Sequence, residues 1–413
     1  MSDTQHGDAI IPPDARAVLR IDLGALRENW ARLNAATGGA DCAGVVKADA
    51  YGLGLEEIAH ALTEEGCATF FVATLEEGRR VRAVQPGAVV HVLDGLLPHA
   101  EAYYSGFDLR PVLSSLEEVE DWAAYCRRTG RRLPAALHID TGINRLGMPE
   151  TEVRQLAAEG AIFQHFDLTL VMSHLACADE PDNPKNAVQR ATFDRLRALL
   201  PPTKASLANS GGTFLGPEFH YDLVRPGIAL YGGRAHEGRH NPMQPVVQLS
   251  ARILQVREVA VGETVGYGAI WHVEQPSRIA TLACGYADGF LRALSTPGKP
   301  GPAGYIGDHP VPIVGRVSMD LITVDVTGVP EGLARRGGWV EIIGDKVTVD
   351  DLTDIAGTIG YELLSRLSRR VHRVYAGGDP QVGSTERPKG VQANRHRSVG
   401  SPPRLAGVSL TTG

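Results

Sequence analysis

The sequence lacks the features that would place the chain in or on a membrane. No apolar run approaches the roughly 20 residues that a membrane-spanning helix needs. The polar segment 1–13 lacks the basic and then apolar pattern of a secretory signal. A net charge of −7 gives no basic excess for nucleic acid or anionic lipid. We therefore expect neither membrane nor nucleic acid among the partners.

Cysteine is also scarce, with five residues among 413. They lie at Cys42, Cys67, Cys126, Cys177 and Cys284. Because they are scattered, odd in number and form no CxxC pair, they predict neither a metal site nor a disulfide framework. This pattern favours a reducing cytoplasm as the location.

The length and composition fit a folded chain of two domains. Hydrophobic residues make up 43% and charged residues 22%, both ordinary values. We expect an N-terminal extension at 1–16, a first domain at 17–243, a second at 244–378 and a tail at 379–413. The tail carries five Lys or Arg against two Asp or Glu and few large apolar residues, so we expect it to be disordered.

Short apolar segments alternate with helical patterns from about residue 17 to residue 233. We expect strands at 18–21, 44–47, 69–73, 89–93, 135–139, 168–172 and 204–208, and helices at 23–33, 55–65 and 75–84. Such alternation predicts parallel βαβ units. Over some 230 residues it fits a single (β/α)8 TIM barrel, which is typically about 250 residues long.

The pattern changes near Pro245. Gly and Pro turns then separate strands expected at 254–256, 278–282 and 321–326, and a helix is expected at 349–364. The predicted fold class is therefore α/β, with an N-terminal (β/α)8 barrel followed by a mainly antiparallel β domain.

Lys47 is the most informative residue, because it closes a buried-type apolar run in the segment VVKADAYGLG (45–54). A buried ammonium must be paired or lose its charge, and a desolvated lysine is a nucleophile that forms Schiff bases. Tyr51 follows, and Gly52 and Gly54 bracket a helix expected from Leu55, whose amides could bind phosphate. Together they suggest an aldehyde cofactor that carries a phosphate. A solvated lysine without function is the alternative.

Polar residues also follow other predicted barrel strands, where barrel enzymes place their chemistry. Arg145 in DTGINRLG could bind a carboxylate with two hydrogen bonds, His174 follows the strand 168–172, and Ser210 opens a Gly-rich turn that suits phosphate. Each of these residues alone could equally be structural.

Arg225 lies in VRPGIALYG (224–232), and the following proline holds it in an extended conformation. Gly227 permits a close approach of the backbone to a ligand. If this cofactor contains a pyridine ring, an arginine that faces the ring nitrogen cannot give up a proton to it. The ring nitrogen then stays unprotonated and the ring withdraws electrons weakly, which favours a brief carbanion.

The second domain contributes three loops with aromatic or polar residues between turns. Tyr267 lies in VGYG, Tyr286 in GYADG, and Met319 and Asp320 end GRVSMD. Each loop alone is consistent with a β-turn that carries a polar or aromatic side chain. Their joint occurrence with the barrel loops is hard to explain by structure alone.

Seven segments in register give the chain a specific resemblance. VVKADAYGLG, DTGINRLG, SHLACADE, VRPGIALYG, VGYG, GYADG and GRVSMD resemble those of alanine racemase, a fold-type III pyridoxal-phosphate enzyme, from about residue 18 to residue 375. The resemblance implies a head-to-tail homodimer with shared active sites, pyridoxal 5'-phosphate as cofactor, and production of D-alanine for peptidoglycan.

The resemblance also implies a role for each matched residue. Lys47 would bind the cofactor as a Schiff base and act on one face of Cα, and Tyr267 of the other subunit would act on the opposite face. Arg225 would pair with the pyridine nitrogen, and His174 would link Arg225 toward Tyr267. The phosphate would be held by Tyr51, Ser210, Gly227 and Ile228. The substrate carboxylate would be bound by Arg145 and the Met319 amide, with Tyr286 and Asp320 along the route into the site.

Two departures leave alternatives open. His138 stands where some members carry a carbamylated lysine, so His138 or a bound anion would have to position Arg145. Arg369 stands where some members carry a tyrosine that contacts phosphate, which leaves a broader amino-acid racemase as a second hypothesis. A non-catalytic pyridoxal-phosphate carrier is a third, although the second domain argues against it. A fold-type III decarboxylase would need a different second domain.

Overall fold

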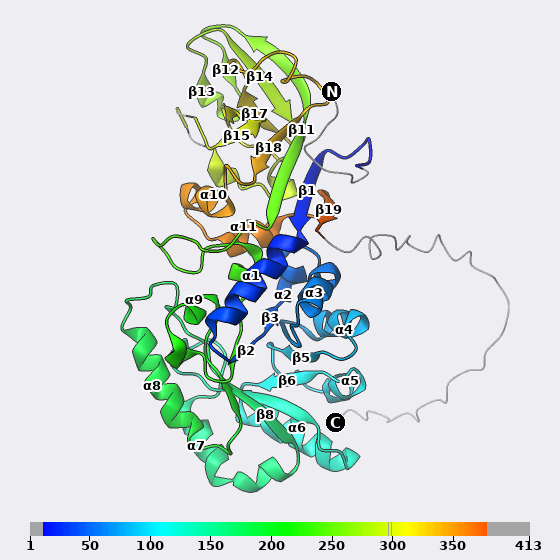
Figure 1. Cartoon of the computed structure of the whole chain (residues 1–413), viewed down its shortest axis with the longest axis vertical. Coiled ribbons are helices and arrows are strands. Elements are labelled where there is room, and N and C mark those ends of the chain that lie inside the picture. The colour runs from blue at the N-terminus through cyan, green and yellow to red at the C-terminus, as the bar shows by residue number, and fades with distance from the viewer. Residues whose placement is uncertain (1–10, 296, 299, 378–413) are drawn as a thin grey trace, which may run out of the picture. The chain divides into compact units, whose positions relative to one another are not determined.

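A computed structural model describes residues 11–295, 297–298 and 300–377. Figure 1 shows a barrel of strands and helices together with a second domain built around antiparallel strands. The predicted tail at 379–413 and most of the predicted extension at 1–16 lie outside the described residues.

The first domain is a ring of parallel strands. Its strands are β2 (Asp41–Cys42), β3 (Gly44–Val45), β4 (Thr69–Val72), β5 (Val89–Val92), β6 (Arg110–Leu113), β7 (Pro134–His138), β8 (Asp167–Met172), β9 (Lys204–Ser206) and β10 (Leu223–Val224). Strands β3 to β9 form one parallel sheet in chain order, and β10 pairs with β2. Strands β4, β5 and β6 each bury three of four residues, as strands covered on both faces do.

Backbone hydrogen bonds close the ring. The Arg225 amide donates to the Ala208 carbonyl (2.9 Å), and the Ala43 amide donates to the Val224 carbonyl (3.0 Å). Only Ala43 separates β2 from β3, so these two act as one interrupted strand. With β4 to β10 they make eight described strand positions, which confirms the predicted (β/α)8 barrel.

Helices follow most barrel strands. They are α3 (Leu55–Glu64), α4 (Leu75–Val84), α5 (Glu101–Gly106), α6 (Leu116–Thr129), α7 (Glu150–Ala158), α8 (Lys185–Arg197) and α9 (Ser210–Thr213). Helix α1 (Leu23–Ala36) precedes the first barrel strand, and the short element α2 (Lys47–Tyr51) has left-handed backbone angles within it. The sequence analysis named neither β6 nor β10 as a strand, and it named none of the helices α5 to α8. Strand β6 has four residues and contains Pro111, a residue that usually argues against a strand.

The strand predicted at 18–21 does form, but not in the barrel. Strand β1 (Ala17–Asp22) pairs antiparallel with β11 (Val247–Val259) and parallel with β19 (His372–Ala376). The prediction that it opens the barrel is therefore wrong. Alternation of apolar residues defines a strand without identifying its partner, so the sequence pattern could not show that β1 pairs with strands of the second domain.

The second domain is mainly antiparallel, as predicted. Its other strands are β12 (Thr264–Val265), β13 (Trp271–His272), β14 (Ser277–Leu282), β15 (Ala303–Ile306), β16 (His309–Pro312), β17 (Ile322–Asp325) and β18 (Trp339–Ile343). The main sheet has the order β16-β15-β18-β11-β1-β19, and β14 pairs with both β11 and β17. The single helix predicted at 349–364 is wrong, because Gly357 (φ 68°) separates α10 (Val349–Ala356) from α11 (Gly360–Arg366).

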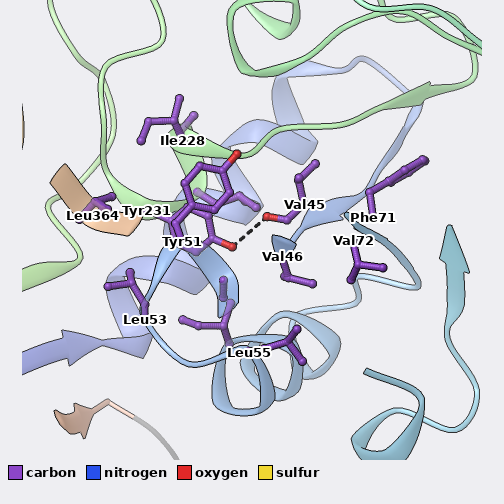
Figure 2. Packing of buried hydrophobic residues seen from close by; sticks show 14 of the residues in the cluster. Val45, Val46, Tyr51, Leu53, Leu55, Phe71, Val72, Ile228, Tyr231 and Leu364 are labelled. Atoms are coloured by element: carbon purple, nitrogen blue, oxygen red, sulfur yellow. Dashed lines mark hydrogen bonds between the residues drawn. The ribbon is translucent and has the colours of Figure 1, made fainter. Parts of the chain in front are cut away.

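The core near Lys47 contains two tyrosines (Figure 2). The ring centroids of Tyr51 and Tyr231 lie 4.6 Å apart, and the Tyr231 hydroxyl donates to the Val45 carbonyl (2.9 Å). Ile228 and Leu364 belong to the same buried cluster, so residues of the barrel and of α11 pack together. Within the described part of the chain, no helix is long and apolar enough to cross a membrane.

The position of β1 predicts a large effect for one core truncation. Leu19 of β1 is fully buried, whereas Leu254 of the adjacent β11 is 42% exposed. Leu19→Ala should lower the free energy of unfolding by about 2–5 kcal/mol, because it leaves a cavity in the sheet. Leu254→Ala should have little effect. Denaturant unfolding measures both variants, and equal small losses would contradict a core role for β1.

Candidate functional site

A cavity of about 660 Å³ opens at the carboxyl ends of the barrel strands. Barrel residues in its lining include Lys47, Arg145, His174, Asn209 and Gly211, and the region of α10 and α11 contributes Asp350, Thr353, Ile359, Gly360 and Tyr361. Lys47 follows β3, His174 follows β8, and Asn209 follows β9. This end of a barrel is where its enzymes carry their chemistry.

Lys47 begins an unusual turn rather than ending a strand. The strand predicted at 44–47 stops at Val45, and Ala48, Asp49, Ala50 and Tyr51 all have positive φ angles of 54°, 56°, 52° and 57°. The Gly52 amide closes this left-handed turn by donating to the Ala48 carbonyl (2.8 Å). Residues other than glycine adopt this conformation at a cost of roughly 1–2 kcal/mol each. Strain of this kind clusters at functional sites.

The surroundings of Lys47 favour its neutral amine. Burial lowers the pKa of Lys47 below its ordinary value of 10.5, and the Arg145 guanidinium lowers it further. Asp94 and Glu77 oppose this change through their negative charges. Because the net pKa is lowered, a larger fraction of the amine is unprotonated near neutral pH than in a solvated lysine.

Arg225 is a buried cation without a carboxylate partner among the described residues. Its Nη2 donates to the Ser173 carbonyl (2.7 Å), its Nη1 donates to the Ser206 hydroxyl, and its guanidinium lies 5.7 Å from the centre of the Phe71 ring. Burial lowers the pKa of Arg225 to about 9. An anion or a ring acceptor that entered the site would meet this uncompensated charge.

The histidines near Arg225 are neutral. Burial and the charges of Arg225 and Arg145 hold the pKa of His174 well below 6.5. Burial, followed by Arg225, lowers the pKa of His138 to about 4, and its Nε2 is buried without a hydrogen-bond partner. In the described structure no hydrogen bond joins His138 to Arg145, so the expectation that His138 positions Arg145 has no direct contact to support it.

Arg145 itself is exposed on a loop that Asp140 shapes. The Asp140 carboxylate accepts hydrogen bonds from the amides of Gly142, Ile143 and Asn144 (3.0–3.2 Å). This places Arg145 at the cavity lining with a side chain that is free to meet a ligand.

Ser210, Gly227 and Tyr51 form a compact group with the geometry of an anion cradle. The buried Ser210 hydroxyl accepts from the amides of Gly227 (2.8 Å) and Ala229 (3.3 Å), so two amides converge on one oxygen. A Cβ on residue 227 would lie 2.2 Å from the Tyr51 hydroxyl, so only glycine lets Tyr51 approach. Ile228 follows in the first turn of the short helix Ile228–Tyr231.

The start of α3, which the sequence suggested as a phosphate site, already holds a carboxylate. The Leu55 amide donates to Asp49 Oδ1 (3.3 Å), and a Cβ on Gly54 would meet the Tyr375 hydroxyl at 2.1 Å. The amides of Gly227 and Ala229, in contrast, converge on a hydroxyl and not on a carboxylate.

The predicted residues of the second domain gather in a separate group of three neighbouring loops. The amides of Tyr286 and Ala287 donate to the carbonyls of Ser318 and Met319 (3.0 and 2.9 Å). A Cβ on Gly266, next to Tyr267, would lie 3.1 Å from the Arg316 amide nitrogen. Tyr267 and Met319 are 72% and 53% exposed. Tyr267, Tyr286, Met319 and Asp320 do not line the cavity of their own chain.

Arg369 and Arg370 lie between the two groups. Arg369 is 83% exposed and its Nη2 lies 3.7 Å from Asp49, so it does not line the cavity. Arg370 pairs with Asp320 (2.6 Å) and Asp288 (3.1 Å). The tyrosine that does line the cavity is Tyr361, whose ring centroid lies 5.7 Å from that of Tyr51. Sequence analysis missed Tyr361, because it sits within a helical pattern that gives no sign of facing a ligand.

Comparisons with known proteins agree over most of the chain. Sequence profiles of the N-terminal and C-terminal domains of alanine racemase match residues 21–235 and 246–375. The chain is 49% identical over 365 residues to a catabolic alanine racemase of Mesorhizobium japonicum, covering 88% of this chain and 94% of the relative. It is 45% identical to a biosynthetic alanine racemase of Agrobacterium fabrum, covering 87% and 94%.

Solved structures give the same answer. The alanine racemase of Bartonella henselae, described with covalently bound pyridoxal phosphate, is similar with a TM-score of 0.83 at 39% identity, over 87% of this chain and 99% of that one. The biosynthetic alanine racemase of Pseudomonas aeruginosa gives a TM-score of 0.80 at 36% identity, over 88% and 99%.

The buried histidines predict a loss of stability in acid. Burial lowers the pKa of His91 to about 3 and that of His138 to about 4, whereas both ionise near 6.5 when unfolded. Between these values the unfolded chain binds more protons than the folded chain, so the free energy of unfolding should fall as the pH drops from 6.5 toward 4.

His138→Gln should flatten that slope by up to about 1.4 kcal/mol per pH unit, because it removes one titrating group from the barrel. Urea unfolding of both proteins at pH 7 and pH 4.5 measures the slopes. The same slope for both would show that His138 does not remain neutral in the folded chain.

Proposed function

The chain belongs to the alanine racemase family of isomerases, and we propose that it interconverts L- and D-alanine with pyridoxal phosphate by a two-base mechanism. The observation that carries this proposal is the half-buried Lys47, with its lowered pKa, at the mouth of a barrel that also holds an anion cradle. The relatives named for the same reaction support it at 45–49% identity.

The residues present fit the cofactor. The amides of Gly227 and Ala229 converge on the Ser210 hydroxyl oxygen, and a phosphate oxygen that took this place would accept from them and from the nearby Tyr51 hydroxyl. Arg225 offers a donor for the pyridine nitrogen, and Lys47 offers the amine for covalent attachment. When bound, pyridoxal phosphate would bind the amino group of the substrate and draw electrons from its Cα–H bond.

The side chains of the protein would move the proton. Lys47 would take or return it on one face of Cα, and Tyr267 of the partner subunit would do so on the opposite face. Arg145 and the Met319 amide of the partner subunit would bind the substrate carboxylate. Tyr286 and Asp320 would line the route into the site.

Arg225 and His174 would favour a brief removal of the Cα proton followed by its prompt return. Arginine keeps its protons, so Arg225 can donate a hydrogen bond to the ring nitrogen without protonating it. Electron withdrawal then stays weak, and prompt return of the proton to Cα is favoured. His174 would connect Arg225 toward Tyr267 as a neutral imidazole, as its lowered pKa supports.

A homodimer with shared sites would bring the two groups of residues together. The exposed Tyr267 does not line the cavity that contains Lys47 in its own chain. A second copy that placed the three neighbouring loops of its second domain over that cavity would supply Tyr267, Met319 and Asp320 together. Each subunit would then lack a complete site alone.

The reaction would supply D-alanine for peptidoglycan. A broader amino-acid racemase is the alternative. It is favoured by Arg369, which stands where some family members carry a phosphate-contacting tyrosine and which lies outside the cavity. Racemisation rates with alanine, serine, lysine and arginine decide between the two. A non-catalytic cofactor carrier is disfavoured by the second domain, which matches along its whole length.

A subunit-mixing experiment tests this function. Lys47→Ala and Tyr267→Phe should each lower the racemisation rate at least about 100-fold, because each removes one acid/base group. When the two variants are mixed, dissociated and allowed to reassociate, activity should return to about a quarter of the wild-type value, since half of random dimers are mixed and each of these has one intact site.

Loss of optical rotation of L-alanine measures the rate. Each variant taken through the same treatment alone is the control and should stay inactive. A mixture that also stays inactive would overturn the shared site, and an active Lys47→Ala protein would overturn the role of Lys47.

A further inference from the structure

A side chain of helix α4 accepts a hydrogen bond from the backbone of the left-handed turn that follows Lys47. The Glu77 carboxylate accepts from the Asp49 amide through Oε1 (3.3 Å) and from the amides of Ala73 (2.9 Å) and Thr74 (3.3 Å) through Oε2. Thr74 and Glu77 also form the capping box of α4. One carboxylate therefore joins the start of a helix to the middle of the strained turn.

The same helix holds the turn by a side chain as well. Arg80 Nη2 donates to Asp49 Oδ1 (2.5 Å), and the Arg80 guanidinium makes two further bonds to Glu56 of α3 (2.6 and 2.7 Å). The side chains of Arg80 and Asp49 are only 27% and 26% exposed. Residues 77 and 80 lie three apart and so share one face of α4.

The turn needs such contacts because its backbone is unfavourable. Ala48 and Ala50 lack polar side chains that could stabilise a left-handed conformation, and each residue from Ala48 to Tyr51 holds its Cβ unfavourably close to the following carbonyl oxygen. A turn released from Asp49 would relax toward the ordinary region and move both of its ends. Those ends are Lys47 and Tyr51.

We propose that Glu77 and Arg80 are positioning residues that fix Asp49 and thereby hold Lys47 at a set place relative to Tyr51. This inference rests on the proposed function, in which Lys47 moves the proton and Tyr51 contacts the phosphate. Neither Glu77 nor Arg80 lines the cavity, so they act through the turn and not on the ligand.

The neighbouring pair on α4 provides a matched control. Glu76 and Arg79 form an ion pair (2.9 Å) with the same three-residue spacing, but they are 67% and 45% exposed, and in the described structure neither makes a hydrogen bond to the turn. Glu76→Gln and Glu77→Gln therefore make the same chemical change on the same helix turn. Only Glu77→Gln removes a contact to Asp49.

Glu77→Gln is also selective within its own site. A glutamine oxygen can still accept from Ala73 and Thr74, as in other capping boxes, so α4 keeps its cap. The amide nitrogen of the glutamine then faces the Asp49 amide, and two donors cannot bond. The helix should remain intact while the turn loses its backbone contact.

Two measurements on the purified holoenzyme test the proposal. Amide hydrogen exchange in peptides covering 46–54 should be faster in Glu77→Gln and unchanged in Glu76→Gln, with α4 and β14 unchanged in both. The value of kcat should fall roughly tenfold to a hundredfold in Glu77→Gln with little change in KM, since misplacement of a reacting group acts on the transition state. Arg80→Lys should show the same pattern, because lysine cannot bridge two carboxylates in the same way.

A second substitution separates positioning from charge. Glycine adopts the left-handed region readily, so Ala48→Gly in the Glu77→Gln background should slow exchange in the turn and restore most of the lost kcat. No recovery would mean that Glu77 acts through its charge, and would overturn the proposal. Equal exchange and equal kcat in Glu77→Gln and Glu76→Gln would overturn it too. If the wild-type enzyme does not racemise alanine, the proposed function fails, while the exchange comparison still tests the hold on the turn.

Discussion

The structure depends on the left-handed turn from Ala48 to Tyr51. It lies between β3 and α3, and its unfavourable backbone persists because other elements grip it from several sides. Helix α4 binds Asp49. Arg373 of β19 donates to the Gly52 carbonyl (2.7 Å), so the second domain also holds the turn. Residues of both domains therefore contact the turn that follows Lys47.

The charges around this turn explain why the cavity suits an anionic ligand. Lys47, Arg145 and Arg225 lie near one another, and the histidines among them are neutral. Within the described chain no carboxylate pairs with Arg225 or Arg145. A phosphate group and a substrate carboxylate would supply the missing negative charge, which is the arrangement expected for pyridoxal phosphate and an amino acid.

Much of the fold and of the barrel site could be predicted from local patterns. Short buried strands followed by helices define the barrel, and polar residues after β8 and β9 mark its functional end. Long-range pairing could not be predicted, because the pattern of residues 17–22 does not show that β1 pairs with β11 and β19. The left-handed turn could not be predicted from the sequence, because Ala48 and Ala50 are residues that strongly favour a right-handed helix. The contacts of Glu77 and Arg80 with Asp49 could not be predicted either, because they depend on the conformation of this turn.

We propose that this turn presents Lys47 as the amine that binds the cofactor. Reduction of the purified protein with borohydride in the presence of pyridoxal phosphate, followed by peptide mass analysis, identifies the lysine that forms the Schiff base. We expect one modified lysine per chain, in the peptide that contains Lys47, because burial lowers the pKa of this amine. Modification spread over exposed lysines, or its absence from the Lys47 peptide, would show that Lys47 is not the amine that binds the cofactor.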